Sequence, residues 1–174
     1  MSQPTEEESE RRRALKIARW MIDQGSFARL LGLEVVEAAP GYCLAALTVR
    51  ADMLNPLKTT HGGITFTLAD FAFGVACNSH GMATFGLSTT ISYPAISREG
   101  DRLTAEAREE SRGRRTGLYR VEVRRDDGTL VGLFMGTSYS TGEPVDKWME
   151  KQEGAMVSTT PSGVVSAEPN PANR

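Results

Sequence analysis

Residues 61–81 read HGGITFTLADFAFGVACNSHG, and this stretch decides the fold. It opens with a glycine pair and then carries apolar or small residues at almost every position, which is typical of a helix buried on all sides. Asp70 is the only acidic residue in the stretch. A carboxylate among apolar residues is costly unless it has partners or a catalytic task. The sequence therefore predicts a central helix that carries one functional acid.

The start of this helix is suited to binding negative charge. Gly62 and Gly63 leave backbone N–H groups without Cβ cover, at the helix end where unpaired N–H groups and the dipole favour anions. Gly62 and Asp70 are eight residues apart, which corresponds to about 12 Å along one helix. An attacking group and the donors that polarise a carbonyl must both lie roughly 3 Å from the reacting atoms. If the acid and the helix start cooperate, the site must join two subunits.

The composition is that of an ordinary globular protein. The chain has 174 residues, is 40% hydrophobic and has a net charge of −2, which fits one domain with extensions. It shows neither the basic excess of a nucleic-acid binder nor an apolar run of the roughly 20 residues that span a membrane. Its N-terminal residues lack the layout of a secretory signal. We therefore expect a cytoplasmic protein that binds neither nucleic acid nor membrane.

The rest of the chain predicts strands on both sides of the central helix in sequence. Residues 1–26 are expected to form an amphipathic helix, because a capping box at Thr5 is followed by apolar residues at helical spacing. Alternating patterns and turn residues predict strands at 33–38, 42–50, 83–93, 102–110, 118–125 and 129–140. This order indicates an α+β domain, residues 27–141, with an antiparallel sheet curved around the helix. Residues 142–174 lose periodicity and are expected to form a flexible tail, in which Trp148 and Met149 could still dock a short piece.

Three segments of the chain resemble a known family. The runs 55–63 (NPLKTTHGG), 68–70 (LAD) and 76–79 (ACNS) closely resemble the phenylacetate-degradation thioesterases of the hotdog superfamily, and the likeness extends over roughly residues 27–139. The resemblance implies a hotdog fold and hydrolysis of acyl-coenzyme A thioesters, with no cofactor besides the coenzyme A of the substrate. It also implies a dimer, or a dimer of dimers, with active sites between subunits. Phe71 departs from the family pattern, in which Ser or Thr often follows the catalytic Asp.

Five residues are the candidates for catalysis. Asp70 is predicted to act as nucleophile or general base, against the alternative of a structural acid that caps a buried donor. Gly62 and Gly63 are predicted to supply oxyanion donors, although they also fit a flexible entry into the helix. His61 either orients the loop near the carbonyl or caps the helix. Asn55 either places a water or the thioester, or begins the Asn-Pro turn.

A basic turn and two cysteines are the remaining candidates for a functional or structural role. Arg114, Arg115 and Thr116 lie in a basic turn between two strands, which either grips the phosphates of coenzyme A or is simply solvated. Cys43 and Cys77 lie in apolar surroundings and are expected to be reduced core residues. With two histidines and no clustered ligands, the sequence predicts no metal site.

Two functions compete with thioester hydrolysis. The first is a non-catalytic module that senses acyl-coenzyme A, which would need no nucleophile and would usually carry a DNA-binding segment. The second is a hotdog hydratase or dehydratase, which would use an acid–His pair on the acyl chain. The presence of Asp70 argues against the first, and the order of His61, the glycine pair and Asp70 fits the second less well.

Overall fold

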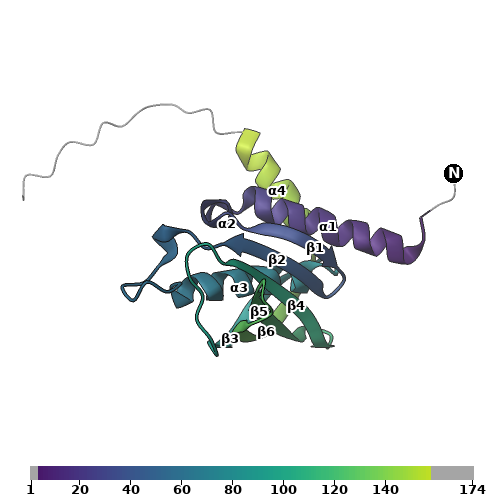
Figure 1. The fold of residues 1–174 in the computed structure, drawn as a ribbon. Coiled ribbons are helices and arrows are strands. Elements are labelled where there is room, and N and C mark those ends of the chain that lie inside the picture. The colour runs from purple at the N-terminus through teal and green to yellow at the C-terminus, as the bar shows by residue number, and fades with distance from the viewer. Residues whose placement is uncertain (1–3, 158–174) are drawn as a thin grey trace, which may run out of the picture.

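The computed structural model describes residues 4–157 and shows one sheet curved around one helix (Figure 1). All neighbouring strands pair antiparallel, in the order β1-β2-β4-β5-β6-β3. The strands are β1 (Glu34–Ala39), β2 (Tyr42–Thr48), β3 (Met82–Ser92), β4 (Arg102–Arg112), β5 (Thr116–Arg125) and β6 (Leu130–Pro144). The helices are α1 (Glu6–Gln24), α2 (Ser26–Leu31), α3 (Gly62–Asn78) and α4 (Asp146–Val157), with a 3₁₀ turn at Ala51–Met53. The predicted α+β architecture is confirmed.

The core lies between α3 and the concave face of the sheet. Phe73 on α3 contacts Tyr119 of β5 and Phe134 of β6, with ring centroids 5.4 and 5.6 Å apart. All three rings are at most 1% exposed. Burying a side chain of this size stabilises a fold by about 1.5–3 kcal/mol. The same face of α3 buries Leu68, Ala69, Ala72, Val75 and Ala76.

Within a single chain, one face of the central helix α3 is left open. Gly63, Thr67, Asp70 and Gly74 follow one another at spacings of four, three and four residues, and none of them is buried. Residues at these spacings lie on one side of a helix. The sheet of a single chain covers only the opposite side. The apolar composition of α3 predicts that the helix is buried. It does not predict that the sheet of a single chain buries every face.

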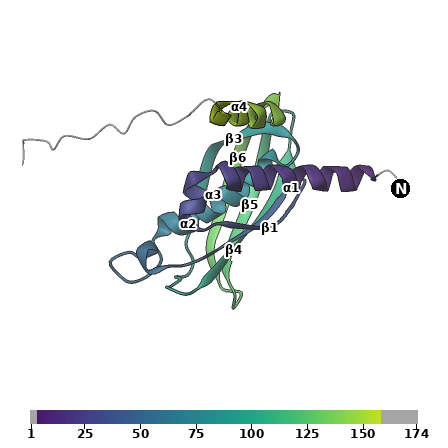
Figure 2. The same cartoon turned by 90° about the horizontal axis from the view of Figure 1, so that it is seen from above.

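Helix α1 confirms the predicted N-terminal helix. Thr5 caps it, because its hydroxyl accepts from the Glu8 N–H and its own N–H donates to the Glu8 carboxylate. Ala14, Ile17 and Ala18 are its buried residues. Helix α1 packs against β1, α2 and α3, and Figure 2 shows it beside α3.

The prediction of a flexible tail from residue 142 onward is wrong for residues 142–157, where the docked piece allowed by Trp148 and Met149 is present. Strand β6 runs to Pro144, and α4 follows it directly. Val145 and Met149 are buried against Ile17 of α1, and Lys16 pairs with Asp146 at 3.0 Å. These contacts with α1 stabilise a helix that local periodicity does not reveal. Residues 158–174 of the predicted tail lie outside the described residues.

Strand β3 forms one edge of the sheet. It is 11 residues long and pairs with β6 on one side only within residues 4–157. Phe85 and Leu87 on this strand are 51% and 61% exposed. A long edge strand with exposed apolar side chains is a template for pairing with another chain. Within the same described range, no helix is long and apolar enough to cross a membrane.

Candidate active site

His61 caps the start of α3. Its Nδ1 accepts from the Gly63 N–H at 3.0 Å, so its proton is on Nε2. The cap that the sequence allowed is therefore present. Tyr93, which follows β3, donates from its hydroxyl to the Gly62 carbonyl at 3.1 Å. The helix start is thus fixed from two sides by residues far apart in the chain.

The two glycine N–H groups at the helix start are not equivalent. The Gly63 N–H is already used by His61. Among residues 4–157, no hydrogen bond involves the Gly62 N–H. Of the two predicted oxyanion donors, Gly62 is therefore the one free to bind a ligand oxygen.

Asn55 shapes the loop that leads into α3. Its side-chain oxygen accepts from the Leu57 N–H at 2.9 Å and the Thr59 N–H at 3.3 Å, while its amide donates to the Thr59 hydroxyl at 2.9 Å. The turn that the sequence allowed for Asn55 is therefore present. A catalytic role for Asn55 stays untested, and its polar atoms are already engaged within the loop.

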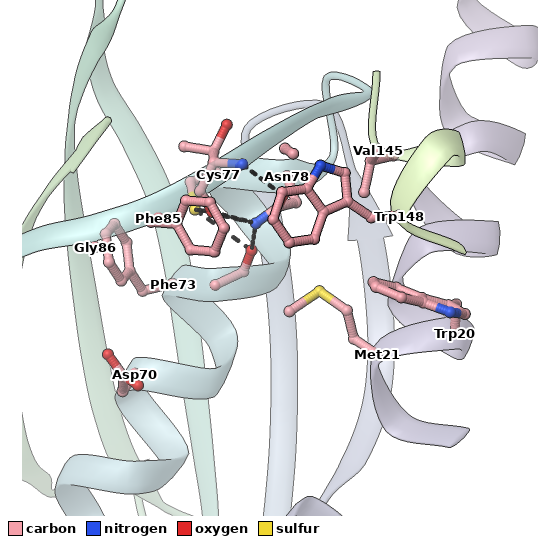
Figure 3. Close-up of a pocket in the computed structure, with 13 residues that line it drawn as sticks. Trp20, Met21, Asp70, Phe73, Cys77, Asn78, Phe85, Gly86, Val145 and Trp148 are labelled. Atoms are coloured by element: carbon pink, nitrogen blue, oxygen red, sulfur yellow. Dashed lines mark hydrogen bonds between the residues drawn. The ribbon is translucent and has the colours of Figure 1, made fainter. Parts of the chain in front are cut away.

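Asp70 lies between two hollows on the open side of α3. One hollow, of about 290 Å³, extends toward β3 and α4 and is shown in Figure 3. The other, of about 440 Å³, extends toward the end of α1 and α2. Trp20, Met21 and Gly74 border both hollows. The Asp70 carboxyl is thus open to space that is mostly lined by apolar side chains.

The surroundings of Asp70 change its acidity. In the single chain its side chain is exposed to the two hollows. The apolar walls nevertheless exclude part of its water, and this desolvation raises the pKa of the carboxyl above its usual range. An acid in an apolar cleft with a raised pKa has the properties expected of a general base or nucleophile.

The basic turn lies at the end of the sheet next to the C-terminal end of α3. Arg112, Arg114, Arg115 and Thr116 line a third hollow of about 250 Å³. Arg115 donates to the Tyr139 hydroxyl at 2.6 Å and lies over the Tyr139 ring. The turn therefore borders a recess lined by three arginines, a residue type that pairs with anionic groups.

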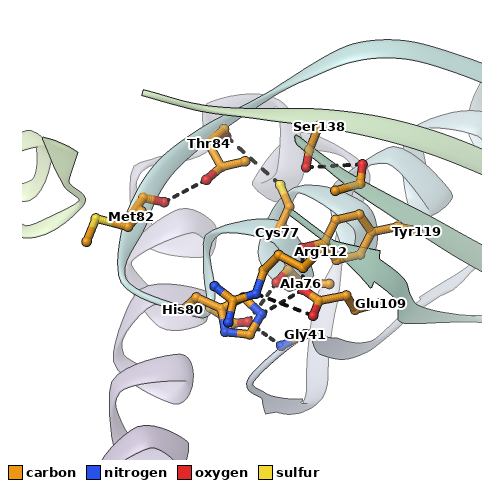
Figure 4. Close-up of polar contacts among 12 residues, drawn as sticks. Gly41, Ala76, Cys77, His80, Met82, Thr84, Glu109, Arg112, Tyr119 and Ser138 are labelled. Atoms are coloured by element: carbon orange, nitrogen blue, oxygen red, sulfur yellow. Dashed lines mark hydrogen bonds and ion pairs between the residues drawn. The ribbon is translucent and has the colours of Figure 1, made fainter. Parts of the chain in front are cut away.

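A network of polar side chains lies at the C-terminal end of α3 (Figure 4). The Glu109 carboxylate lies 2.7 Å from His80 Nε2, accepts from the Tyr119 hydroxyl at 2.7 Å, and pairs with Arg112 at 3.5 Å. Burial and the Glu109 charge raise the pKa of Tyr119 far above its usual range. Glu109 on β4 is thus the partner of His80 at the end of α3, a contact between residues far apart in the chain.

The two cysteines are free and buried. Burial raises the pKa of Cys43 and of Cys77 to about 12, so both are protonated thiols at neutral pH. The prediction that they are core residues outside a disulfide is confirmed. Within residues 4–157, no three His, Cys, Asp or Glu side chains come together as a metal-binding group.

Three aromatic residues near the site were missed in the sequence. Trp20 and Trp148 come from the two terminal helices and border the 290 Å³ hollow beside Asp70, and Tyr93 contacts Gly62. For Tyr93, the only local sign of a role at the site was its position directly before Pro94. The two tryptophans gave none, because their positions depend on how α1 packs against α3 and how α4 packs against α1 and Phe85 of β3.

A curved antiparallel sheet around a helix that starts with a glycine pair and carries a central acid is the hotdog architecture. The chain belongs to the thioesterase superfamily, whose sequence pattern matches residues 57–132. It is 36% identical over 130 residues to the acyl-coenzyme A thioesterase PaaI of Escherichia coli K12. The matched region covers 75% of this chain and 93% of the relative. The hotdog fold predicted from the resemblance is confirmed.

Two solved structures illustrate the similarity. The Escherichia coli PaaI protein from the phenylacetic acid degradation operon superposes with a TM-score of 0.75 at 35% identity, over 77% of this chain and 97% of that chain. A hypothetical thioesterase protein of Streptococcus pneumoniae TIGR4, determined with coenzyme A, gives a TM-score of 0.67 at 26% identity. That match covers 71% of this chain and 98% of the other.

Proposed function

We propose that this protein is an enzyme that hydrolyses acyl-coenzyme A thioesters to free acids and coenzyme A. The observation that carries this proposal is Asp70, a desolvated acid on the open face of α3, on the helix whose start presents the unused Gly62 N–H. Membership of the thioesterase superfamily supports it. So do the names of two similar proteins, an acyl-coenzyme A thioesterase and a thioesterase-like protein with coenzyme A.

The proposed working unit is a dimer of identical chains. One helix cannot bring the Gly62 N–H and the Asp70 carboxylate to the same carbonyl, because they are about 12 Å apart. A second copy, related by a two-fold axis, supplies the missing half to each site. The edge of β3 and the open stripe of α3 are the surfaces that such a copy would cover. Pairing of two such dimers is a further prediction, supported by the family resemblance alone.

The proposed reaction divides the work between the two subunits. The Gly62 N–H of one subunit donates to the thioester oxygen as negative charge develops on it. Asp70 of the other subunit either attacks the carbonyl carbon or removes a proton from an attacking water. The C–S bond then breaks and the sulfur of coenzyme A takes up a proton that derives from water. The acyl group gains the hydroxyl of that water, either directly or, where Asp70 has attacked, when the water cleaves the acyl–Asp70 anhydride. His61 holds the donor loop in shape through its bond to the Gly63 N–H.

Other parts of the chain are proposed to bind the phosphates and the acyl group of the substrate. The basic turn with Arg114, Arg115 and Thr116 is proposed to bind the phosphates of coenzyme A, supported by the recess that these residues line. The apolar walls beside Asp70 favour aromatic acyl groups, of the phenylacetyl type, or medium-chain ones. We place the enzyme in the cytoplasm, where two free cysteines remain reduced.

The test is release of free thiol from purified protein. A panel of acyl-coenzyme A thioesters of different acyl size is incubated with the enzyme and a thiol reagent. Hydrolysis gives thiol in proportion to the enzyme, and the panel identifies the preferred acyl group. A sensing module would bind the thioesters without releasing thiol, and a hydratase would change the acyl chain while leaving the thioester intact.

A further inference from the structure

The free Gly62 N–H belongs to the peptide that joins His61 to Gly62, and hydrogen bonds anchor the backbone on both sides of it. On the N-terminal side, the His61 N–H donates to the Met53 carbonyl at 2.8 Å. Within residues 4–157, the peptide with the free N–H uses only its carbonyl, which accepts from the Ile64 N–H at 2.9 Å. On the C-terminal side lies the peptide between Gly62 and Gly63. The direction of the free N–H is therefore set by the contacts of its neighbours.

The peptide between Gly62 and Gly63 is held at both of its polar ends. Its N–H donates to His61 Nδ1 at 3.0 Å, and its carbonyl accepts from the Tyr93 hydroxyl at 3.1 Å. Partial burial raises the pKa of Tyr93 above its usual range, so the hydroxyl is protonated and donates at neutral pH. Two adjacent glycines have no side chains to restrict their dihedral angles. The contacts with Tyr93 and His61 therefore keep this peptide from reorienting.

Tyr93 belongs to a segment that braces the entry to α3. Ser97 lies four residues after Tyr93. Its hydroxyl donates to the Thr60 hydroxyl at 2.7 Å, and its carbonyl accepts from the Thr60 N–H at 2.9 Å. Ser97 and Thr60 are both buried, which shields these bonds from water. All of these contacts lie within one chain, so a second copy on α3 and β3 would leave them in place.

The Tyr93 ring occupies the space beside Gly62 that a side chain would need. A Cβ on Gly62 would lie 3.3 Å from Tyr93 Cζ and 3.5 Å from the hydroxyl oxygen. The φ of Gly62 is not positive, so its backbone conformation is one that alanine can adopt. The Tyr93 ring is half-exposed and can move outward. Alanine at position 62 would therefore displace the ring and withdraw its hydroxyl from the Gly62 carbonyl.

We propose that Tyr93 is a positioning residue that holds the Gly62 N–H in the direction required to stabilise the oxyanion. This inference rests on the proposed thioesterase function and adds a residue outside the predicted catalytic set. Tyr93 acts through the peptide between Gly62 and Gly63. An oxyanion donor must point at the place that the oxygen takes in the transition state. Loss of the Tyr93 hydroxyl should therefore lower kcat and leave KM nearly unchanged.

The test compares Tyr93→Phe with Tyr42→Phe in the thiol-release assay, at a temperature well below the Tm of every variant. Each substitution removes one phenolic hydroxyl. That of Tyr42 donates to Glu106 of β4 at 3.2 Å, and Tyr42 borders neither hollow beside Asp70. Tyr93→Phe should lower kcat by about tenfold and change KM by no more than about twofold. Tyr42→Phe should leave both constants at the wild-type values.

A second substitution tests whether the effect passes through the contact with Gly62. Gly62→Ala should lower kcat to about the level of Tyr93→Phe, because the new Cβ displaces the ring. In a Tyr93→Ala background the ring is absent. Adding Gly62→Ala to that background should therefore cost no more than about a further twofold. Losses that multiply would show that the two residues act independently, and would overturn the inference.

Hydrogen exchange gives a readout that does not depend on turnover. The Gly63 N–H belongs to the peptide that Tyr93 anchors. Its exchange with solvent, followed by NMR, should be faster in Tyr93→Phe than in wild type and unchanged in Tyr42→Phe. Tyr93→Phe with unchanged exchange at Gly63, or with wild-type kcat, overturns the inference, as does an equal loss of kcat in Tyr42→Phe. A wild type that releases no thiol from any thioester refutes the proposed function instead.

Discussion

Gly62 and Asp70 lie on one helix, eight residues apart, with the free N–H at the helix start and the acid in its middle. About 12 Å of helix separates them. The acid faces the open side of α3, where the sheet of its own chain does not reach. This separation is the physical reason for proposing that two chains form each active site.

Replacing Asp70 by Asn should abolish most of the activity. The amide has nearly the same shape but is neither a nucleophile nor a base, so we expect kcat to fall by two orders of magnitude or more. The thiol-release assay measures this, and circular dichroism checks that the fold is intact. Near-normal turnover by the purified variant would remove Asp70 from the mechanism.

The same substitution should stabilise the protein at neutral pH. Desolvation raises the pKa of the Asp70 carboxyl, so the folded chain holds this proton to higher pH than the unfolded chain does. Ionised Asp70 therefore opposes folding at pH 7, and stability is gained as pH falls through the folded-state pKa. Asp70→Asn should raise Tm at pH 7, and the difference should shrink in acid. A lower Tm than wild type at pH 7, at equal protein concentration, would contradict the desolvated environment.

Two inactive variants should restore activity when they are mixed. A Cβ at Gly62 would lie 3.3 Å from the Tyr93 ring, so Gly62→Val should displace the donor loop while leaving Asp70 intact. Under subunit exchange with Asp70→Asn, half of the dimers are mixed and each contains one complete site. Activity should therefore recover to about a quarter of wild type. A mixture that stays inactive while mixed dimers form would exclude shared sites, as would an active monomer.

Removing a guanidinium from the basic turn should weaken substrate binding. Arg114→Ala should raise KM by about tenfold and leave kcat nearly unchanged, because it removes a charge-assisted contact that is equal in ground and transition states. Arg98→Ala, another exposed arginine that does not line the recess, is the matched control. An unchanged KM for Arg114→Ala would show that the turn is only solvated.

The Tyr119 hydroxyl should contribute measurably to stability. It donates to Glu109 from a side chain that is 1% exposed, and a hydrogen bond to a charged group is worth about 1.5–3 kcal/mol. In the variant Glu109 keeps its contacts with His80 and Arg112. We therefore expect Tyr119→Phe to lower the free energy of unfolding by about 1–2 kcal/mol. Denaturant titration measures this, with Tyr139→Phe as a control that removes a more exposed hydroxyl, bonded to Arg115. A loss no larger than that of the control would mean that the network adds nothing to stability.

Much of the site was visible in the sequence. Local residues specify the helix with its glycine start, the position of Asp70, the capping box at Thr5 and the alternation of the strands. The Asn55 turn and the His61 cap are local as well, and both were among the alternatives that the sequence allowed. Each of these features depends on residues within a few positions of one another.

The sequence by itself determined the order of the strands, the N-terminal and central helices, the curved sheet around α3 and the distance along one helix that calls for a second chain. Only the tertiary structure decided which face of α3 stays open, that α4 docks on α1, and that Asp70 lies between two hollows. Those outcomes depend on contacts such as Trp148 with Phe85 and Tyr93 with Gly62. Periodicity and capping act over one or two turns of chain, whereas these contacts join residues tens of positions apart, and no local pattern records them.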